Sequence, residues 1–220
     1  MTRTGAVSEP VPRHRSYGPE ATMPARTDAD LRDEMTRPLL FLDVDGPLNP
    51  YAAQPERRPA GYVTLRVPVE SGVLGNRGGL SARRPLRVWL SPRHGPALLD
   101  LGYELCWATT WTAEANRWIG PVLGLPELPF VDFGDGLLRE RPDGVHWKTG
   151  PLVEYAAGRP FAWVDDEQSD LDTAYVAAHH TGPWLLHHVN PRIGLREDDF
   201  RALADFVPGP GVSGPGPVSR

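Results

Sequence analysis

A short apolar run that ends in two carboxylates limits what this chain can fold into more than any other feature. Residues 38–42 (PLLFL) are apolar, Asp43 and Asp45 follow, and Gly46 comes next. The run predicts a buried strand, and in an open α/β sheet ligands bind beyond the carboxyl ends of the strands. Two carboxyl groups spaced i, i+2 at that edge can approach one polar ligand or cation. The alternative is a turn with two solvated aspartates, which Asp and Gly also suit.

The rest of the chain alternates between expected strands and helices. Further strands are expected at 61–69, 86–90, 103–108, 161–164 and 184–189, and helices at 92–101, 112–119, 149–158, 169–178 and 196–206. From residue 92 onward the alternation is typical of parallel strands joined by crossover helices. We therefore expect a three-layer α/β sandwich with a mainly parallel sheet.

Both ends of the chain differ in composition from the part between them. Residues 1–37 are polar and proline-containing without hydrophobic periodicity, and residues 208–220 are rich in Pro and Gly. Such segments bury too little apolar surface to offset the entropy lost on ordering. We expect disordered tails on either side of one domain at 38–207. Met35 lies just before the first strand, so the sequence leaves the start of translation open between Met1 and Met35.

Composition narrows the class of protein. The formal net charge of −5 argues against binding nucleic acid over the whole surface, although a local basic patch is compatible with it. Cys106 is the only cysteine, which rules out an intramolecular disulfide framework. No apolar run approaches the roughly 20 residues that span a membrane, and the N-terminus lacks a segment of signal-peptide type. We expect a cytoplasmic protein with no membrane partner, and the sequence does not indicate its oligomeric state.

A segment at about 50–90 interrupts the strand–helix alternation. Its two expected strands flank the glycine-rich GVLGNRGG, which predicts a β-hairpin flap beside the edge where the first strand ends. Arginines are concentrated in and next to this flap: Arg57, Arg58, Arg66, Arg77, Arg83, Arg84, Arg87 and Arg93. Only Glu56 and Glu70 oppose them, so an anionic substrate is expected, such as a polyphosphate or a nucleic-acid end. Alternatively, arginine is the usual solvated residue of this chain, because Lys148 is the sole lysine among 23 lysine and arginine residues.

Three strands of the expected sheet end in polar residues. These residues are Asp43 and Asp45, then Thr109 and Thr110, then Asp165 and Asp166. Clustered carboxylates repel one another unless a cation holds them, and Mg²⁺ takes oxygen ligands of this kind. Lys148, between the last two strands, indicates a position where a compact ammonium group is needed. The tryptophans next to these residues, Trp107, Trp111 and Trp147, either pack in the core or stack a base.

The segments FLDVDG, LCWAT, HWKT and FAWVDDE follow one another along the chain. Together they resemble the four motifs of the haloacid dehalogenase (HAD) superfamily of phosphohydrolases. The spacing of WATTW, HWK and WVDDE, followed by LLHHVNPRIGL, is most similar to small HAD domains related to bacterial RNA-repair proteins. The resemblance covers about residues 38–207 and implies a HAD-like Rossmannoid fold in which the hairpin flap is a small cap.

The resemblance implies a role for each matching residue in phosphoryl transfer. Asp43 would be the nucleophile that forms an aspartyl-phosphate, and Asp45 would act as general acid and then as general base. Thr109, with Thr110 as the alternative, would hydrogen-bond the phosphoryl oxygens. Lys148 would neutralise their charge and orient the nucleophile.

The resemblance also implies a magnesium site. Asp43, Asp165 and the backbone carbonyl of Asp45 would hold Mg²⁺, and Asp166 would support or complete the shell, with Asp170 as a second candidate for that place. The expected function is a Mg²⁺-dependent phosphohydrolase, a phosphomonoesterase acting on a phosphorylated small molecule, a nucleotide or a nucleic-acid end. The alternatives are a non-catalytic phosphate- or RNA-binding module and a phosphotransferase of the same fold.

Overall fold

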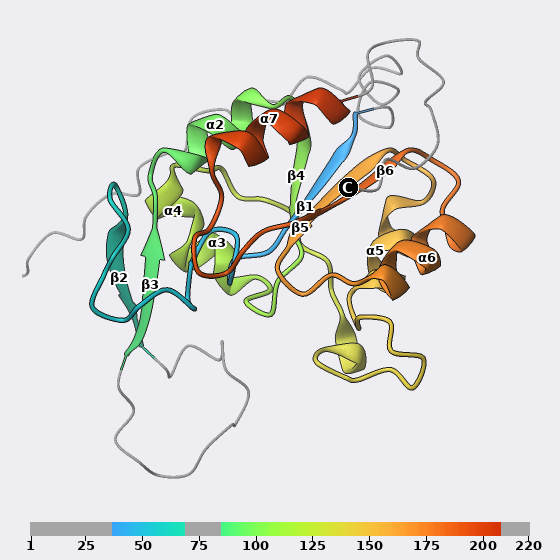
Figure 1. The fold of residues 1–220 in the computed structure, drawn as a ribbon, viewed down its shortest axis with the longest axis horizontal. Coiled ribbons are helices and arrows are strands. Elements are labelled where there is room, and N and C mark those ends of the chain that lie inside the picture. The colour runs from blue at the N-terminus through green and yellow to red at the C-terminus, as the bar shows by residue number, and fades with distance from the viewer. Residues whose placement is uncertain (1–36, 69–84, 208–220) are drawn as a thin grey trace, which may run out of the picture.

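A parallel sheet of four strands forms the centre of the computed structural model, which describes residues 37–68 and 85–207 (Figure 1). In spatial order the strands are β4 (Glu104–Trp107), β1 (Leu39–Leu42), β5 (Phe161–Asp165) and β6 (Trp184–His188). Each neighbouring pair is parallel. The expected mainly parallel sheet is therefore confirmed, with the Asp43 strand in its interior, where the carboxyl ends of its two neighbours flank it.

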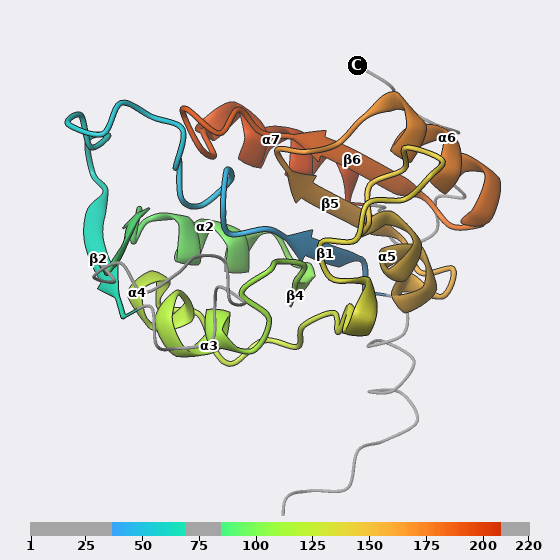
Figure 2. The same cartoon turned by 90° about the horizontal axis from the view of Figure 1, so that it is seen from below.

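Helices pack on both faces of the sheet because the strands alternate apolar side chains between two cores. Leu40 and Leu42 of β1 belong to one core, and Leu39 and Phe41 belong to the other. The first core also contains side chains of α2 (His94–Asp100), α3 (Glu114–Trp118), α4 (Gly120–Leu123) and α7 (Glu197–Phe206). The second contains side chains of α5 (Thr149–Ala156) and α6 (Asp170–His179), which lie together in Figure 2. Two-sided coverage explains why the strands are apolar on both faces.

The expected hairpin is also present. Strands β2 (Val63–Val67) and β3 (Leu86–Leu90) form a separate antiparallel sheet, which lies at one side of the molecule in Figure 1. Leu65 and Val88 are partners in this ladder and pack in or against the first core, so one face of the hairpin is anchored to the domain. The glycine-rich turn expected between the strands lies outside the described residues.

Some expectations were wrong in detail or fall beyond the structure. The helix expected at 112–119 begins only at Glu114, because Thr112 has a φ of 47°, and a second short helix, α4, follows it. Cys106 lies fully buried in the second core, as expected for a strand residue.

The expected tails at 1–37 and 208–220 lie outside the described residues, apart from Arg37. Within the described ranges, no helix combines the length and the apolar composition needed to cross a membrane.

Candidate active site

The carboxyl edge of the sheet brings Lys148 between two aspartates. Its ammonium nitrogen lies 3.0 Å from Asp43 Oδ2 and 2.7 Å from Asp165 Oδ2. All three side chains are buried, and Lys148 is only 2% exposed. Asp43 follows the last residue of β1, and Asp165 is the last residue of β5, so the parallel pairing of these strands sets the two carboxylates side by side.

Charge keeps this buried lysine protonated. Burial alone lowers the pKa of Lys148, but the negative charges of Asp165 and Asp43 outweigh it, and the net shift is upward. Asp165 accepts two further hydrogen bonds, from Trp163 Nε1 at 3.0 Å and from the backbone N–H of Glu167 at 3.0 Å. The lysine therefore has a fixed position and a fixed charge.

A third carboxylate makes this edge a candidate metal site. One carboxylate oxygen from each of Asp43, Asp165 and Asp166 lies within 4.8 Å of the other two. Burial, together with the charges of Asp165 and Asp45, raises the pKa of Asp43 against the opposing effect of Lys148. Three carboxylates around one ammonium leave an excess of negative charge, and oxygen atoms are the donors that hard divalent cations prefer. The cluster therefore fits a divalent cation.

The turn after β1 is shaped around Asp166. Gly46 has a φ of +95°, and a Cβ at this position would overlap the Asp166 carboxyl group. Tyr51, a few residues further along, donates a hydrogen bond from its hydroxyl to Asp166 Oδ2 at 3.0 Å. The glycine of the DVDG segment thus allows Asp166 to approach, and Tyr51 holds it there.

Asp45 stands apart from the three clustered carboxylates. Asn49 Nδ2 donates to its Oδ1 at 2.7 Å, and Trp111 Nε1 donates to its Oδ2 at 2.9 Å. Burial raises the pKa of Asp45, whereas these two hydrogen bonds lower it, and the net shift is upward. Burial thus favours the protonated form of this carboxyl group, which suits a group that carries a proton. The expectation that the Asp45 backbone carbonyl binds a metal stays a prediction.

Thr109 lies at the same edge, two residues after β4, and is buried. Its hydroxyl accepts a hydrogen bond of 3.4 Å from the backbone N–H of Trp111, so it adjoins the tryptophan that holds Asp45. Among the described residues it forms no hydrogen bond with Asp43 or Lys148. Thr110 is more exposed than Thr109, which favours Thr109 as the residue that faces the site.

Asp172 is a positioning residue that sequence reasoning missed. It is fully buried and accepts hydrogen bonds from the backbone N–H of His146, from the Thr149 hydroxyl and from the backbone N–H and hydroxyl of Ser169. It thereby ties the N-terminus of α6 to both sides of Lys148. The available signal was the capping box formed by Ser169 and Asp172, three residues apart. Asp170, the other candidate on this helix, is exposed and lies outside the carboxylate cluster.

The chain matches no protein-family model, and comparisons with curated proteins and with solved structures also found no match. The chemistry of the site is therefore inferred from its own residues. The buried carboxylate of Asp43 lies next to the ammonium of Lys148, and Asp165 and Asp166 can complete a cation site with it. Asp45 is held separately and can carry a proton.

Proposed function

We propose that this chain is a Mg²⁺-dependent phosphohydrolase of the HAD type, a phosphomonoesterase that acts through an aspartyl-phosphate on Asp43. The observation that carries the proposal is the buried ammonium of Lys148, which lies 3.0 Å from Asp43 and 2.7 Å from Asp165 at neighbouring strand ends. A lysine fixed in this way neutralises an incoming phosphoryl group and keeps the nucleophilic carboxylate oriented. The proposal also accounts for the order of DVDG, Thr109, Lys148 and Asp165 along the chain.

The donors fit Mg²⁺ better than they fit softer ions. Asp43, Asp165 and Asp166 offer only carboxylate oxygens, and no histidine or cysteine joins this cluster in the described part of the chain. Mg²⁺ favours such hard ligands and usually keeps several waters, which leaves room for a substrate oxygen. When bound, it would supply positive charge for the phosphoryl group.

The protein residues account for both half-reactions. In the first, an Asp43 oxygen forms a bond to phosphorus, the bond from phosphorus to the leaving oxygen breaks, and that oxygen takes the proton of Asp45. In the second, Asp45 takes a proton from water, the water oxygen bonds to phosphorus, and the bond to Asp43 breaks. The raised pKa of Asp45 suits its first role, because a proton must be present at the start.

The substrate class that we propose is a phosphorylated nucleotide or a nucleic-acid end. Transfer to an alcohol in place of water would use the same intermediate on Asp43, so a phosphotransferase differs only in the acceptor. A non-catalytic phosphate- or RNA-binding module would need neither the nucleophile nor a proton-bearing Asp45.

Phosphate release by the purified full chain tests the proposal. Small phosphoesters, nucleotides and oligonucleotides with 3′- or 5′-phosphates are assayed with Mg²⁺ and with a chelator. We expect metal-dependent release that falls by at least about 10³-fold in Asp43→Asn and stays unchanged in Asp198→Asn, an exposed aspartate of α7. Asp43→Asn with wild-type activity would contradict the mechanism. If the folded protein binds Mg²⁺ but releases phosphate from none of these substrates, the binding module is favoured.

A further inference from the structure

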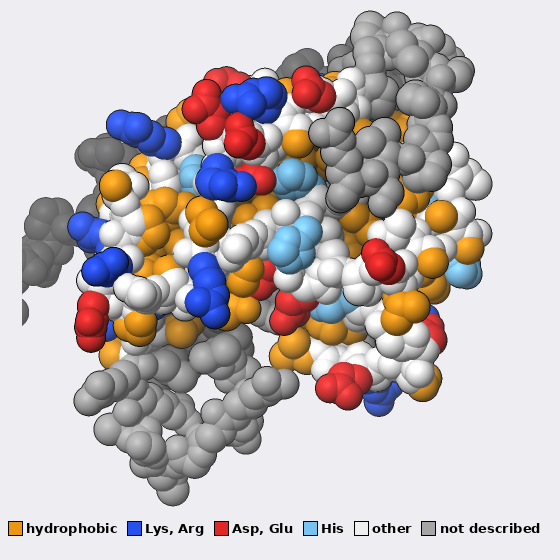
Figure 3. All heavy atoms as spheres, in the orientation of Figure 1, with side chains coloured by type: hydrophobic (Ala, Val, Ile, Leu, Met, Phe, Trp, Pro, Cys, Tyr) orange, Lys and Arg blue, Asp and Glu red, His pale blue; other side chains and the backbone are white. Residues whose placement is uncertain are grey.

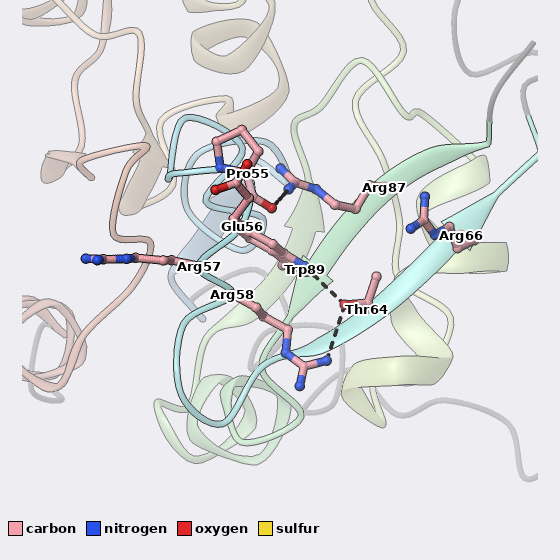
Figure 4. Close-up of a pocket in the computed structure, with 8 residues that line it drawn as sticks. All are labelled: Pro55, Glu56, Arg57, Arg58, Thr64, Arg66, Arg87 and Trp89. Carbon is pink, nitrogen blue, oxygen red and sulfur yellow. Dashed lines mark hydrogen bonds between the residues drawn. The ribbon is translucent and has the colours of Figure 1, made fainter.

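A hollow of about 660 Å³ lies on the outer face of the β2–β3 hairpin, separate from the carboxylate site. Figure 4 shows its lining residues around the hairpin strands. The side chains that matter here are Arg57, Arg58, Thr64, Arg66, Arg87 and Trp89. Four of these six are arginines, and the only acidic side chain in the lining is Glu56. None of them contributes to the site proposed above.

The ladder of the hairpin places four of these side chains on one face, whereas Arg57 and Arg58 come from the loop before β2. Thr64 is paired with Trp89, and Arg66 is paired with Arg87, while the residues between them face the core. Arg66 and Arg87 are therefore direct cross-strand partners with the same charge, an arrangement that destabilises a sheet. Figure 4 shows their guanidinium groups apart from each other, with that of Arg87 turned toward Pro55. The two side chains therefore bring positive charge to two parts of the pocket.

These arginines lack the carboxylate partners that other arginines of the chain have. Arg117, Arg141, Arg159, Arg196 and Arg201 each lie within 4.0 Å of a carboxylate oxygen. Within the part of the chain that the structure describes, the four pocket arginines form no ion pair. In Figure 3, Lys and Arg side chains gather on the half of the molecule that carries β2 and β3. The positive charge of the pocket is thus available to a ligand.

Neutral contacts hold two of the four guanidinium groups in position. Arg87 donates to the backbone carbonyl of Pro55 at 2.8 Å and lies 3.8 Å above the centre of the Trp89 ring. Arg58 donates to the Thr64 hydroxyl at 3.3 Å, and Trp89 Nε1 donates to the same oxygen at 3.1 Å. Ordering before binding lowers the entropy that a ligand must overcome. Because these contacts are neutral, they leave the charge of each arginine uncompensated.

We propose that this pocket binds an anion that carries two or more linked phosphate groups. The guanidinium fork matches phosphate oxygens, and arginine is the side chain that recognises them with two parallel hydrogen bonds. Four separate arginines around a hollow of about 660 Å³ exceed what one phosphate ion can contact, whereas a chain of phosphates can reach several. The ligand class is therefore a phosphate chain, held either by anhydride links or by the sugar links of a nucleic-acid strand.

A short path joins the pocket to Asp45. The backbone N–H of Trp89 donates to Asn49 Oδ1 at 3.0 Å, and Asn49 Nδ2 donates to Asp45 Oδ1 at 2.7 Å. Only one side chain therefore separates the pocket strand from the proposed general acid. If the proposed function holds, the pocket takes the phosphates of the substrate that are not transferred. The link between the pocket and the substrate rests on the proposed phosphohydrolase function. The binding of phosphate chains by the pocket does not depend on it.

Binding of two probes in a chelator tests the pocket without catalysis. The probes are inorganic tripolyphosphate and a short labelled single-stranded oligonucleotide without a terminal phosphate, each titrated into the full chain at low and moderate salt. We expect salt-dependent binding of at least one probe, weakened at least about 10-fold in the double variant Arg66→Ser/Arg87→Ser. The double variant Arg117→Ser/Arg201→Ser removes the same charge elsewhere and should bind within about 2-fold of wild type.

Arg57→Ser keeps the test decisive if the hairpin variant is unstable, because the Arg57 side chain has no hydrogen-bond or ion-pair partner among the described residues. We expect it to weaken binding by about 3-fold. Stronger binding of the oligonucleotide assigns a nucleic-acid strand, and stronger binding of tripolyphosphate assigns an anhydride chain. Equal losses in the two double variants, no binding of either probe, or equal binding of single inorganic phosphate would overturn the proposal. Because binding is measured without metal, its outcome is independent of any phosphatase activity.

Discussion

Lys148 and the four pocket arginines are two cationic regions of one molecule. Carboxylates of the protein pair with the first region and not, among the described residues, with the second. At the sheet edge one buried ammonium is shared by Asp43 and Asp165. Four arginines of the hairpin and of the loop before β2 line a hollow and form no ion pair among the described residues. Burial explains the difference, because a charge removed from water needs a partner inside the protein, whereas a solvated one does not. The buried, paired ammonium is thus a fixed part of its site, whereas the solvated, unpaired arginines leave their charge available to a partner from outside.

The largest effect that this comparison predicts comes from Lys148→Met. The change leaves Asp43 and Asp165 buried without their ammonium, so we expect a loss of about 3–5 kcal/mol in the free energy of unfolding at neutral pH. Urea denaturation in a chelator measures the loss. Added Mg²⁺ should restore part of it, since a cation can replace the missing charge, while phosphate release should stay abolished.

Arg201→Met is the matched control, because Arg201 also pairs with an aspartate but does so on the surface of α7. Its effect should stay below about 1 kcal/mol. If the two variants lose similar stability, burial does not separate the two regions, and the comparison is wrong.

Asn49→Ala breaks the hydrogen-bonded path between the two regions. Asp45 loses one of the two donors that lower its pKa, and the backbone N–H of Trp89 loses its acceptor. We expect kcat to fall by about 10–100-fold and the pH–rate limb that belongs to Asp45 to move to higher pH. A kinetic pH profile on the substrate found in the release assay measures both.

Gln54→Ala, in the exposed loop after Asn49, is the control and should leave the profile unchanged. A uniform loss of activity in Asn49→Ala, without movement of the limb, would mean that Asn49 supports only the local fold.

Much of the fold could be predicted from the sequence because its signals are local. Apolar runs in the sequence predicted β1, β5 and β6. The capping box at Ser169 marks the start of α6. The start of α3 was misplaced because Thr112 adopts a positive φ in the turn that follows β4. Residue preferences do not reveal such a turn, in which the backbone N–H of Thr112 donates to the carbonyl of Thr109.

Part of the candidate site could be predicted because its residues belong to short motifs. Asp43 and Asp165 lie at the carboxyl ends of β1 and β5, whose parallel pairing brings them together, and Lys148 lies directly before α5 and reaches both. The contacts of Asp172 with His146 and of Tyr51 with Asp166 join residues far apart in the sequence. No periodicity encodes such contacts. The arginine excess of the flap was visible, but only the ladder register showed which arginines share a face.

Asp166→Asn tests how a carboxylate of the cluster affects stability when no cation is bound. Burial and the charge of Asp165 raise the pKa of Asp166 to about 6, from an ordinary value of 3.8. Its stabilising contribution is thus complete below about pH 4 and is lost as the pH rises through 6. Without metal at pH 7.5, the variant should be more stable than wild type by about 1–2 kcal/mol, a value reduced for partial exposure.

Thermal unfolding with and without Mg²⁺ gives the second half of this test. Wild type should gain stability from the cation, and Asp166→Asn should gain less, because one of three clustered oxygens no longer carries charge. Asp198→Asn, on the exposed surface of α7, should match wild type in both conditions. Equal gains in wild type and Asp166→Asn would remove Asp166 from the metal site.

The smallest expected effect on stability comes from Arg66→Thr. This variant separates the effect of the hairpin charges on stability from their effect on ligand binding. The change removes one of two like charges that face each other across the ladder, and threonine favours strands. We expect the free energy of unfolding to stay constant or to rise by up to about 0.5 kcal/mol, measured by urea denaturation, while binding of the phosphate-chain probe weakens. A loss above about 1 kcal/mol would show that Arg66 stabilises the hairpin. Unchanged stability with weaker binding would mean that the chain keeps Arg66 for a ligand, in contrast to Lys148, whose replacement is expected to destabilise the fold.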